Sequence, residues 1–104
     1  MCIGQYGFEL KFLQYIDVVL NKIHLIDRGP SISYNINDKP HTYFIDFIIK
    51  GTNCVFEIKS KYFWNKSKEI NIIKKYEAEK LYNYNLIIDN DFSNLMEIFE
   101  KYEK

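Results

Sequence analysis

Two acidic residues and a lysine occupy positions that packing alone does not explain. Asp46 interrupts the apolar run Tyr43–Ile49, where an ionised carboxylate is unfavourable unless a cation or hydrogen-bond donors compensate it. Glu57 and Lys59 lie two residues apart in the next apolar run, so on a β-strand both side chains leave the same face of the sheet. If the two runs pair as a hairpin in the simplest register, Asp46 faces this pair.

Such a set of side chains suits metal-dependent hydrolysis of a phosphodiester. Two converging carboxylates repel each other unless a divalent cation lies between them, and oxygen ligands select Mg²⁺ or Mn²⁺ over softer metals. The metal would lower the pKa of a water and offset charge on the phosphate, while Lys59 could hold the water or neutralise that charge. The structural alternative is a cross-strand ion pair between Lys59 and an acid, with Asp46 at a strand bulge.

Glu9 is a further acidic residue with two interpretations. At about 100° per residue in a helix, Glu9 falls within the arc of apolar residues that begins at Phe8 and ends at Ile23. A carboxylate inside a buried stripe needs a partner, and a metal site on the sheet would provide one. Alternatively, Glu9 stands at the border of the stripe and reaches solvent from the first helical turn.

The hydrophobic pattern predicts the elements that would position these residues. It indicates a helix over Tyr6–Ile23, a break at 27–30, a strand over Ile32–Ile36, a turn at 37–40, and a hairpin of Thr42–Ile49 and Cys54–Lys59 around a turn at 51–53. A helix over Ser67–Tyr82 capped by Ser67, a strand over Asn85–Asp89 and a helix over Phe92–Tyr102 complete the order α-β-β-β-α-β-α. Because the last strand follows a helical crossover, it should run parallel to its neighbour in a mixed sheet.

The helical periodicity also predicts which side chains face the sheet. The inward residues of the first two helices should be Phe8, Phe12, Ile16, Val19 and Ile23, then Ile70, Ile73, Ala78 and Leu81. With 104 residues, of which 47% are hydrophobic, the chain should form one α/β domain over residues 1–104.

The remaining features of the composition exclude several classes of protein. No apolar stretch approaches the roughly 20 residues that span a bilayer, and Met1–Gly7 lacks the layout of a secretion signal, so we expect a soluble, intracellular, cytoplasmic protein. Cys2 and Cys54 lack metal-ligand spacing, which favours reduced thiols. His24 and His41 have no partner at catalytic spacing, which favours structural or surface positions.

Charge is distributed unevenly along the chain. The formal net charge is zero, which argues mildly against a nucleic-acid partner, yet residues 59–75 hold six lysines and one acid, whereas residues 76–104 hold seven acids and three lysines. The residues of the basic segment that could contact a nucleic acid are Lys61, Trp64, Lys66, Lys74 and Lys75. Tyr62, Phe63 and Trp64 could stack on unpaired bases or cap the helix packing, and ordinary solvated lysines explain the charge as well.

These residues together resemble the PD-(D/E)XK nucleases. The matching features of the hairpin are the run His41–Ile49 with Asp46, the ten residues that separate Asp46 from Glu57, and the segment Phe56-Glu57-Ile58-Lys59-Ser60 followed by Phe63-Trp64. The other matching features are the leading helix with Glu9 and the tail with Ala78-Glu79-Lys80 and Tyr84–Ile88. The similarity covers most of the chain and is greatest to short phage-type members, including the phage endonuclease I family of Holliday-junction resolvases, which is compatible with a phage or viral gene. It departs at Ile45, where the family often has proline.

The resemblance implies a fold and an activity. The fold is a restriction-endonuclease-like α-β-β-β-α-β core with a mixed sheet flanked by helices, plus a C-terminal helix. The activity is Mg²⁺-dependent cleavage of DNA, with Mn²⁺ able to substitute and with junctions, branched or nicked DNA among the substrates. Asp46 and Glu57 would be metal ligands with the Ile58 carbonyl, Lys59 the catalytic lysine and Glu9 an outer acid.

Assembly and two alternative functions complete the expectations. Because so small a chain offers one site, cutting both strands would require a homodimer. The chain could instead be a catalytically inactive nuclease fold that binds nucleic acid or protein, or a structural protein with a chance match to the motif.

Overall fold

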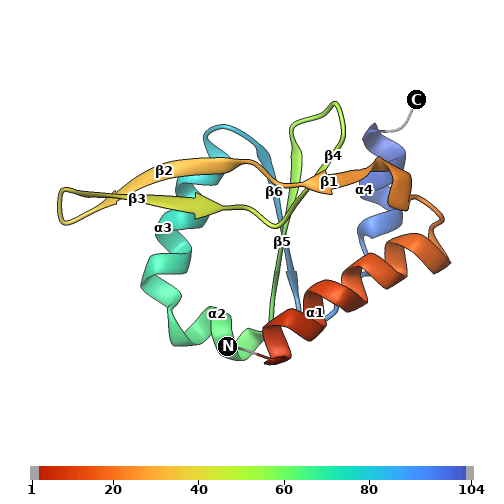
Figure 1. Cartoon of the computed structure of the whole chain (residues 1–104), viewed down its shortest axis with the longest axis horizontal. Helices are drawn as coiled ribbons and strands as arrows, with labels where there is room; N and C mark the ends of the chain where they lie inside the picture. Colours follow the sequence, from red (N-terminus) through yellow and green to blue (C-terminus); the bar gives the residue numbers. More distant parts are fainter. Residues whose placement is uncertain (1–2, 103–104) are drawn as a thin grey trace.

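A four-stranded mixed sheet forms the centre of the fold. In the computed structural model of the chain, which describes residues 3–102, β4 (Phe47–Ile49) and β5 (Cys54–Lys59) form the antiparallel hairpin that the sequence predicts. β6 (Asn83–Ile88) runs parallel to β5, and β1 (Ile26–Arg28) pairs antiparallel with β4, which gives the order β1-β4-β5-β6 (Figure 1). The predicted mixed sheet, with its parallel strand after a helical crossover, is therefore present.

Helices and a separate two-stranded ribbon cover the sheet. The other elements are α1 (Ile3–Gln14), a π-helical turn (Tyr15–Val19), a 3-10 turn (Ile23–Leu25), β2 (Ser31–Ile36), β3 (Lys39–Phe44), α2 (Lys61–Lys66), α3 (Lys68–Glu79) and α4 (Leu95–Tyr102). Within residues 3–102, no helix combines the length and the apolar content needed to cross a bilayer.

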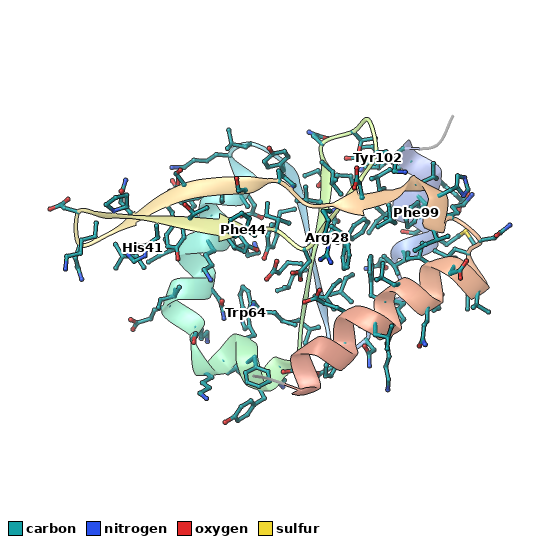
Figure 2. The ribbon with its side chains drawn as sticks, in the orientation of Figure 1. Arg28, His41, Phe44, Trp64, Phe99 and Tyr102 are labelled. Atoms are coloured by element: carbon teal, nitrogen blue, oxygen red, sulfur yellow. The ribbon has the colours of Figure 1, made fainter. Side chains whose placement is uncertain are left out.

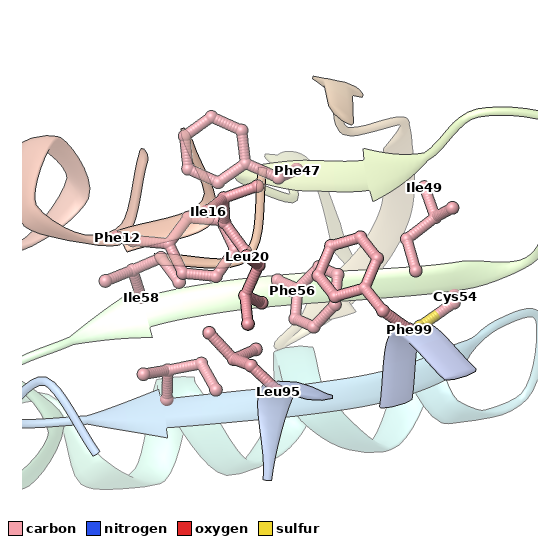
Figure 3. Packing of buried hydrophobic residues seen from close by; sticks show 11 residues of the cluster. Phe12, Ile16, Leu20, Phe47, Ile49, Cys54, Phe56, Ile58, Leu95 and Phe99 are labelled. Atoms are coloured by element: carbon pink, nitrogen blue, oxygen red, sulfur yellow. The ribbon is translucent and has the colours of Figure 1, made fainter. Parts of the chain in front are cut away.

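The two faces of β5 meet different layers. On one face, α1 and α4 pack on the sheet through Phe12, Ile16, Leu20, Phe47, Ile49, Cys54, Phe56, Ile58, Ile87, Leu95 and Phe99 (Figure 3). On the other face, α3 and the β2-β3 ribbon form a smaller cluster of Ile32, Tyr34, Tyr43, Ile45, Val55 and Ala78. Because side chains alternate along a strand, Glu57 and Lys59 leave β5 on the side of Val55, opposite Phe56 and Ile58.

The prediction of one continuous strand over Thr42–Ile49 is wrong. The chain kinks at Ile45-Asp46, which separates β3 from β4. Opposite the kink, the N–H of Gly29 donates to the carbonyl of Asp46 at 3.1 Å, and the N–H of Ile45 donates to that of Pro30 at 3.0 Å. A Cβ atom at Gly29 would lie 2.1 Å from the Ile45 carbonyl oxygen, so only glycine permits this approach. The predicted break at 27–30 is correspondingly shorter, because its first two residues belong to β1.

A π-helical turn changes which side of the first helix is buried. One regular helix over Tyr6–Ile23 was predicted, with Val19 and Ile23 inward, but these are 59% and 36% exposed. The N–H of Leu20 donates to the carbonyl of Tyr15, five residues earlier. This wider turn advances the buried face by one residue and places Leu20 in the core.

A short helix that was not predicted precedes the helix expected over Ser67–Tyr82. The Ser60 hydroxyl caps α2, and the first residue of the expected helix makes no side-chain cap. The buried Asn71 amide donates to the carbonyls of Phe63 and Trp64 at 3.3 and 3.0 Å, which satisfies the end of α2 and fixes the corner with α3.

Smaller corrections concern the buried face of α3 and the element boundaries. Ala78 is buried as predicted, but Ile70 and Leu81 are 41% and 64% exposed, because α3 ends before Leu81 and meets the ribbon along a narrower stripe. The last strand begins at Asn83 and the last helix at Leu95. Cys54 is a buried free thiol, whereas Cys2 lies outside the described residues.

Candidate active site

The kink between β3 and β4 turns Asp46 towards β5. Asp46 Oδ2 accepts a hydrogen bond from the backbone N–H of Ile58 at 2.8 Å. Phe47, the first residue of β4, pairs with Phe56 of β5, so Asp46 just before it lies beside Glu57. The structure therefore brings Asp46 together with the two functional residues predicted on β5.

Glu57 is buried in spite of its charge, with an exposed fraction of 3%. Its Oε2 atom lies 3.4 Å from Lys59 Nζ, whereas Oε1 is buried and has no hydrogen-bond partner among the described residues. The structural alternative of an ion pair is thus realised within β5 rather than across strands, and Asp46 does stand at a strand break. The ion pair nevertheless leaves Oε1 without a hydrogen-bond partner among the described residues, which is rare for a buried polar atom, although the Tyr43 hydroxyl interacts with the carboxylate.

Burial raises the pKa of both carboxyl groups. Burial first, and the negative charge of Glu57 second, raise the pKa of Asp46 to about 8, against the opposing effects of the Ile58 N–H and the Lys59 charge. Burial also raises the pKa of Glu57, against the opposing effects of Lys59, the Tyr43 hydroxyl and a more distant lysine. Both carboxyl groups are therefore harder to ionise than an exposed carboxyl group. A divalent cation bound between them would favour their ionised forms.

Glu9 approaches this pair from α1. Its residue is half-buried, and its negative charge contributes to the raised pKa of Asp46. The first helix therefore brings a third acidic side chain close enough to Asp46 for its charge to act on that carboxyl group.

Two tyrosines beside Glu57 were missed in the sequence. Tyr43 is 5% exposed on β3 and Tyr84 is half-buried near the start of β6, and their hydroxyl groups interact with each other next to the Glu57 carboxylate. Burial is the main reason why the pKa of each tyrosine is raised, and the charge of Glu57 adds to it. The available signal was strand alternation, because the exposed Thr42 and Phe44 flank Tyr43 and turn it inward.

Lys74 is the predicted nucleic-acid contact whose charge acts on the Glu57 carboxyl group. Its Nζ atom lies 5.1 Å from the centroid of the Tyr43 ring, and its positive charge lowers the pKa of Glu57. Burial, together with the nearby charge of Lys59, lowers the pKa of Lys74 itself. Lys74 is half-buried and interacts with the charges of Lys59 and Glu57, so it differs from the solvated surface lysines that could also explain the basic segment.

The other four predicted contacts have different surroundings, and one of them, Lys75, also places its Nζ atom 6.0 Å from the centroid of the Tyr84 ring. Lys75 pairs with Glu79 at 2.9 Å on the surface of α3, and Lys66 Nζ lies 5.8 and 6.0 Å from two aromatic rings of its own helix. Lys61 is exposed at the start of α2. Trp64 is half-buried and points from α2 towards the centre of the molecule (Figure 2).

The groups that could hold a metal are the carboxylates of Asp46 and Glu57 and the main-chain carbonyl of Ile58. Within the part of the chain that the structure describes, no group of three or more His, Cys, Asp or Glu side chains could hold a metal ion. A cation here would rest on two carboxylates and a main-chain oxygen, with water or substrate oxygens completing its shell, as is common for Mg²⁺. The partnerless Glu57 Oε1 and the resisted ionisation of Asp46 fit such a cation.

Comparisons with protein-family models, with curated proteins and with solved structures find no match to this chain. They assign the chain to no family. The geometry and the charge of the site are therefore the observations that bear on function.

Proposed function

We propose that the chain is a metal-dependent endodeoxyribonuclease of the PD-(D/E)XK class, which hydrolyses DNA phosphodiester bonds. The observation that carries the proposal is the kink at Ile45-Asp46, which turns a second carboxylate onto β5 beside Glu57 and Lys59. Buried carboxylates are unfavourable for the fold unless a partner compensates them, and one oxygen here has no partner in the described chain. The helix before the hairpin and the parallel strand after the crossover support a restriction-endonuclease-like core.

Asp46, Glu57 and the Ile58 carbonyl would hold Mg²⁺, and Mn²⁺ can substitute because oxygen ligands suit both ions. When bound, such an ion lowers the pKa of a water molecule and offsets the negative charge that grows on the phosphate.

The protein's own residues position the reacting groups. The Ile58 N–H fixes the Asp46 carboxylate, and the Glu57 carboxylate holds Lys59 Nζ at 3.4 Å. From that position the Lys59 ammonium can donate to a water or to a phosphate oxygen, and so neutralise charge as the bond breaks. Glu9 adds a carboxylate on α1 that can accept a hydrogen bond from water.

An inactive nuclease fold that binds nucleic acid or protein is the alternative function. Such a module would gain nothing from buried carboxylates next to its binding surface, because their negative charge opposes the phosphates of DNA. We therefore prefer the nuclease. One active site cuts one strand, so cleavage of both strands of a duplex or junction would involve a homodimer.

The test is cleavage of end-labelled duplex, single-stranded, nicked and four-way-junction DNA in the presence of Mg²⁺ or Mn²⁺. Asp46→Asn and Lys59→Ala should each lower the rate by about 100-fold or more, because each removes a charged group that stabilises the transition state. Asp17→Asn and Lys101→Ala are matched controls, since both residues are exposed.

Two results would overturn the proposal. One is wild-type cutting by Asp46→Asn, which would place the reaction elsewhere or in a contaminant. The other is the absence of metal-dependent cutting of every DNA, with the variants binding DNA as the wild type does, which would leave the binding module.

A further inference from the structure

A pocket lies on the same side of the sheet as Glu57 and Lys59. It has a volume of about 450 Å³ and opens between the β2-β3 ribbon on one side and α2 and α3 on the other. This volume lies within the roughly 300–1,000 Å³ typical of small-molecule sites. The long kinked ribbon is what creates it, because the ribbon leaves the sheet at Asp46 and extends over α3 (Figure 1).

Aromatic rings line the pocket from opposite sides. On the ribbon, the rings of Tyr34 and His41 stack with centroids 5.4 Å apart and planes at 23°. From α2, the half-buried Phe63 forms part of the opposite wall. His41 is exposed on β3 (Figure 2) and lines this wall of the pocket. Flat rings on two sides of a pocket suit a flat aromatic ligand such as a nucleobase.

The charges of the pocket are suited to a phosphate. Lys59 and Lys74 both line it, and none of the described residues that line it is acidic. The same two lysines face the candidate active site, since Lys59 Nζ lies 3.4 Å from Glu57 Oε2 and the charge of Lys74 acts on the Glu57 carboxyl group. A phosphate held by both lysines would therefore stand between the active site and the aromatic walls.

We propose that this pocket binds one unpaired nucleotide of a DNA strand, adjacent to the phosphate that is cut; this inference rests on the proposed nuclease function. The base lies against Phe63 and the Tyr34-His41 stack, and its phosphate meets Lys59 and Lys74. A paired base cannot enter, because its face is already stacked on its neighbours within the duplex. The pocket thus selects DNA with an unpaired or displaced nucleotide over a continuous duplex.

The test is the binding of three fluorescent DNAs of matched length in a chelator, which prevents metal-dependent cleavage. These are a continuous duplex, a duplex with one unpaired nucleotide, and a single strand. The wild type should bind the two unpaired DNAs about tenfold more tightly than the duplex, as expected for stacking of one base. Phe63→Ala and His41→Ala should lose that preference and keep the affinity for the duplex.

The control variant is Tyr76→Ala, which removes an exposed aromatic residue of α3 that does not line the pocket. Its preference should equal that of the wild type. Because His41 is exposed, His41→Ala should fold even if Phe63→Ala does not. Equal affinity of the wild type for all three DNAs, or an intact preference in both pocket variants, would overturn the inference.

Cleavage of the same DNAs separates the pocket from the proposed function. If Asp46-dependent cutting occurs but does not distinguish unpaired from continuous DNA, the pocket inference fails and the nuclease stands. If no DNA is cut, yet unpaired nucleotides bind through Phe63 and His41, the nuclease fails and the pocket stands as a binding site.

Discussion

Asp46 is a residue on which stability and chemistry make opposite demands. Burial and the neighbouring Glu57 favour its neutral form in the metal-free chain, whereas a metal ligand has to be ionised. Only the backbone N–H of Ile58 and the charge of Lys59 favour the ionised form of Asp46. The metal-free protein should therefore show a dependence on pH that exposed carboxylates do not produce.

The first prediction concerns this dependence. The pKa of Asp46 rises from its ordinary value of 3.8 to about 8 on folding, so between these values the folded state holds a proton that the unfolded state releases. The free energy of unfolding should fall by on the order of 5 kcal/mol as pH rises through that window, at about 1.4 kcal/mol for each pH unit, and the raised pKa of Glu57 acts in the same direction. Urea unfolding across the window measures it. Asp46→Asn should flatten the slope and the exposed Asp17→Asn should not; a wild-type slope in Asp46→Asn would contradict the assignment.

The second prediction concerns Phe12, which joins α1 to the sheet. Its ring is fully buried, with centroids 5.2 Å from Phe47 and 5.3 Å from Phe56. Phe12→Ala should lower the free energy of unfolding by about 3–5 kcal/mol, because it leaves a cavity under the helix. Leu10→Ala on the same helix, where the side chain is 51% exposed, should cost less than about 1 kcal/mol. Urea unfolding compares the two, and similar losses would mean that α1 packs differently.

At the scale of elements, the kinked ribbon decides where the chemistry lies. β1-β4 and β2-β3 form one long antiparallel pair that bends where Gly29-Pro30 faces Ile45-Asp46. Had the strand continued straight, Asp46 would have remained in a regular ladder instead of reaching the Ile58 N–H. A backbone feature on one strand thus positions a carboxylate on the other.

The third prediction tests this coupling. A Cβ atom at Gly29 would meet the Ile45 carbonyl oxygen at 2.1 Å, which is backbone and cannot swing away. Gly29→Ala should therefore destabilise the fold by about 1–3 kcal/mol and abolish metal-dependent cleavage by moving Asp46. Gly51→Ala is the matched control, because Gly51 has φ of 74° but open space around it. It should lose about 1 kcal/mol of stability and keep its cleavage activity. Equal activity in both variants would contradict the claim that the kink at Gly29 positions Asp46 for cleavage.

The elements that sequence predicts well are those fixed by local pattern. The apolar run that follows the turn at 51–53 predicts the strand Cys54–Lys59, and the two-residue spacing of Glu57 and Lys59 places both side chains on one face of it. The kink was not predictable from Thr42–Ile49 alone, since it depends on Gly29 and Pro30, which lie between β1 and β2. The π-helical turn was not predicted either; at its first residue the Tyr15 ring packs on Phe92, which lies far along the chain, with the ring centroids 4.7 Å apart.

The candidate site divides in the same way. A charge inside an apolar run is visible in sequence, so Asp46, Glu57 and Lys59 were predicted as site residues. Tyr43 and Tyr84 were not, because a tyrosine on a strand is equally well explained by packing. The pocket was also beyond prediction, because its walls come from segments whose relative placement is set by the kink and by the corner between α2 and α3.

At the scale of the whole molecule, the ribbon gives the chain an elongated shape. The radius of gyration is 13.8 Å and the principal extents are 42 × 29 × 19 Å, where a compact chain of this length would have a radius of about 13 Å. The sheet with α1 and α4 holds the larger apolar cluster, and the ribbon with α3 holds the smaller one. The two carboxylates lie where these halves join, so a ligand bound there should stabilise the entire fold.

The fourth prediction is that Mg²⁺ stabilises the chain as a whole. A ligand present at about 100 times its dissociation constant adds about 2.7 kcal/mol to the free energy of unfolding, which raises the Tm of a domain of this size by roughly 10 °C or more. The rise should be larger near pH 8 than near pH 5, because burial raises the pKa of Asp46 to about 8 and the metal requires its ionised form. Thermal unfolding with Mg²⁺ and with a chelator measures it. Asp46→Asn and Glu57→Gln should lose the rise and the exposed Asp17→Asn should keep it; an equal rise in all of them would mean that the ion binds elsewhere and that the two buried carboxylates are not its ligands.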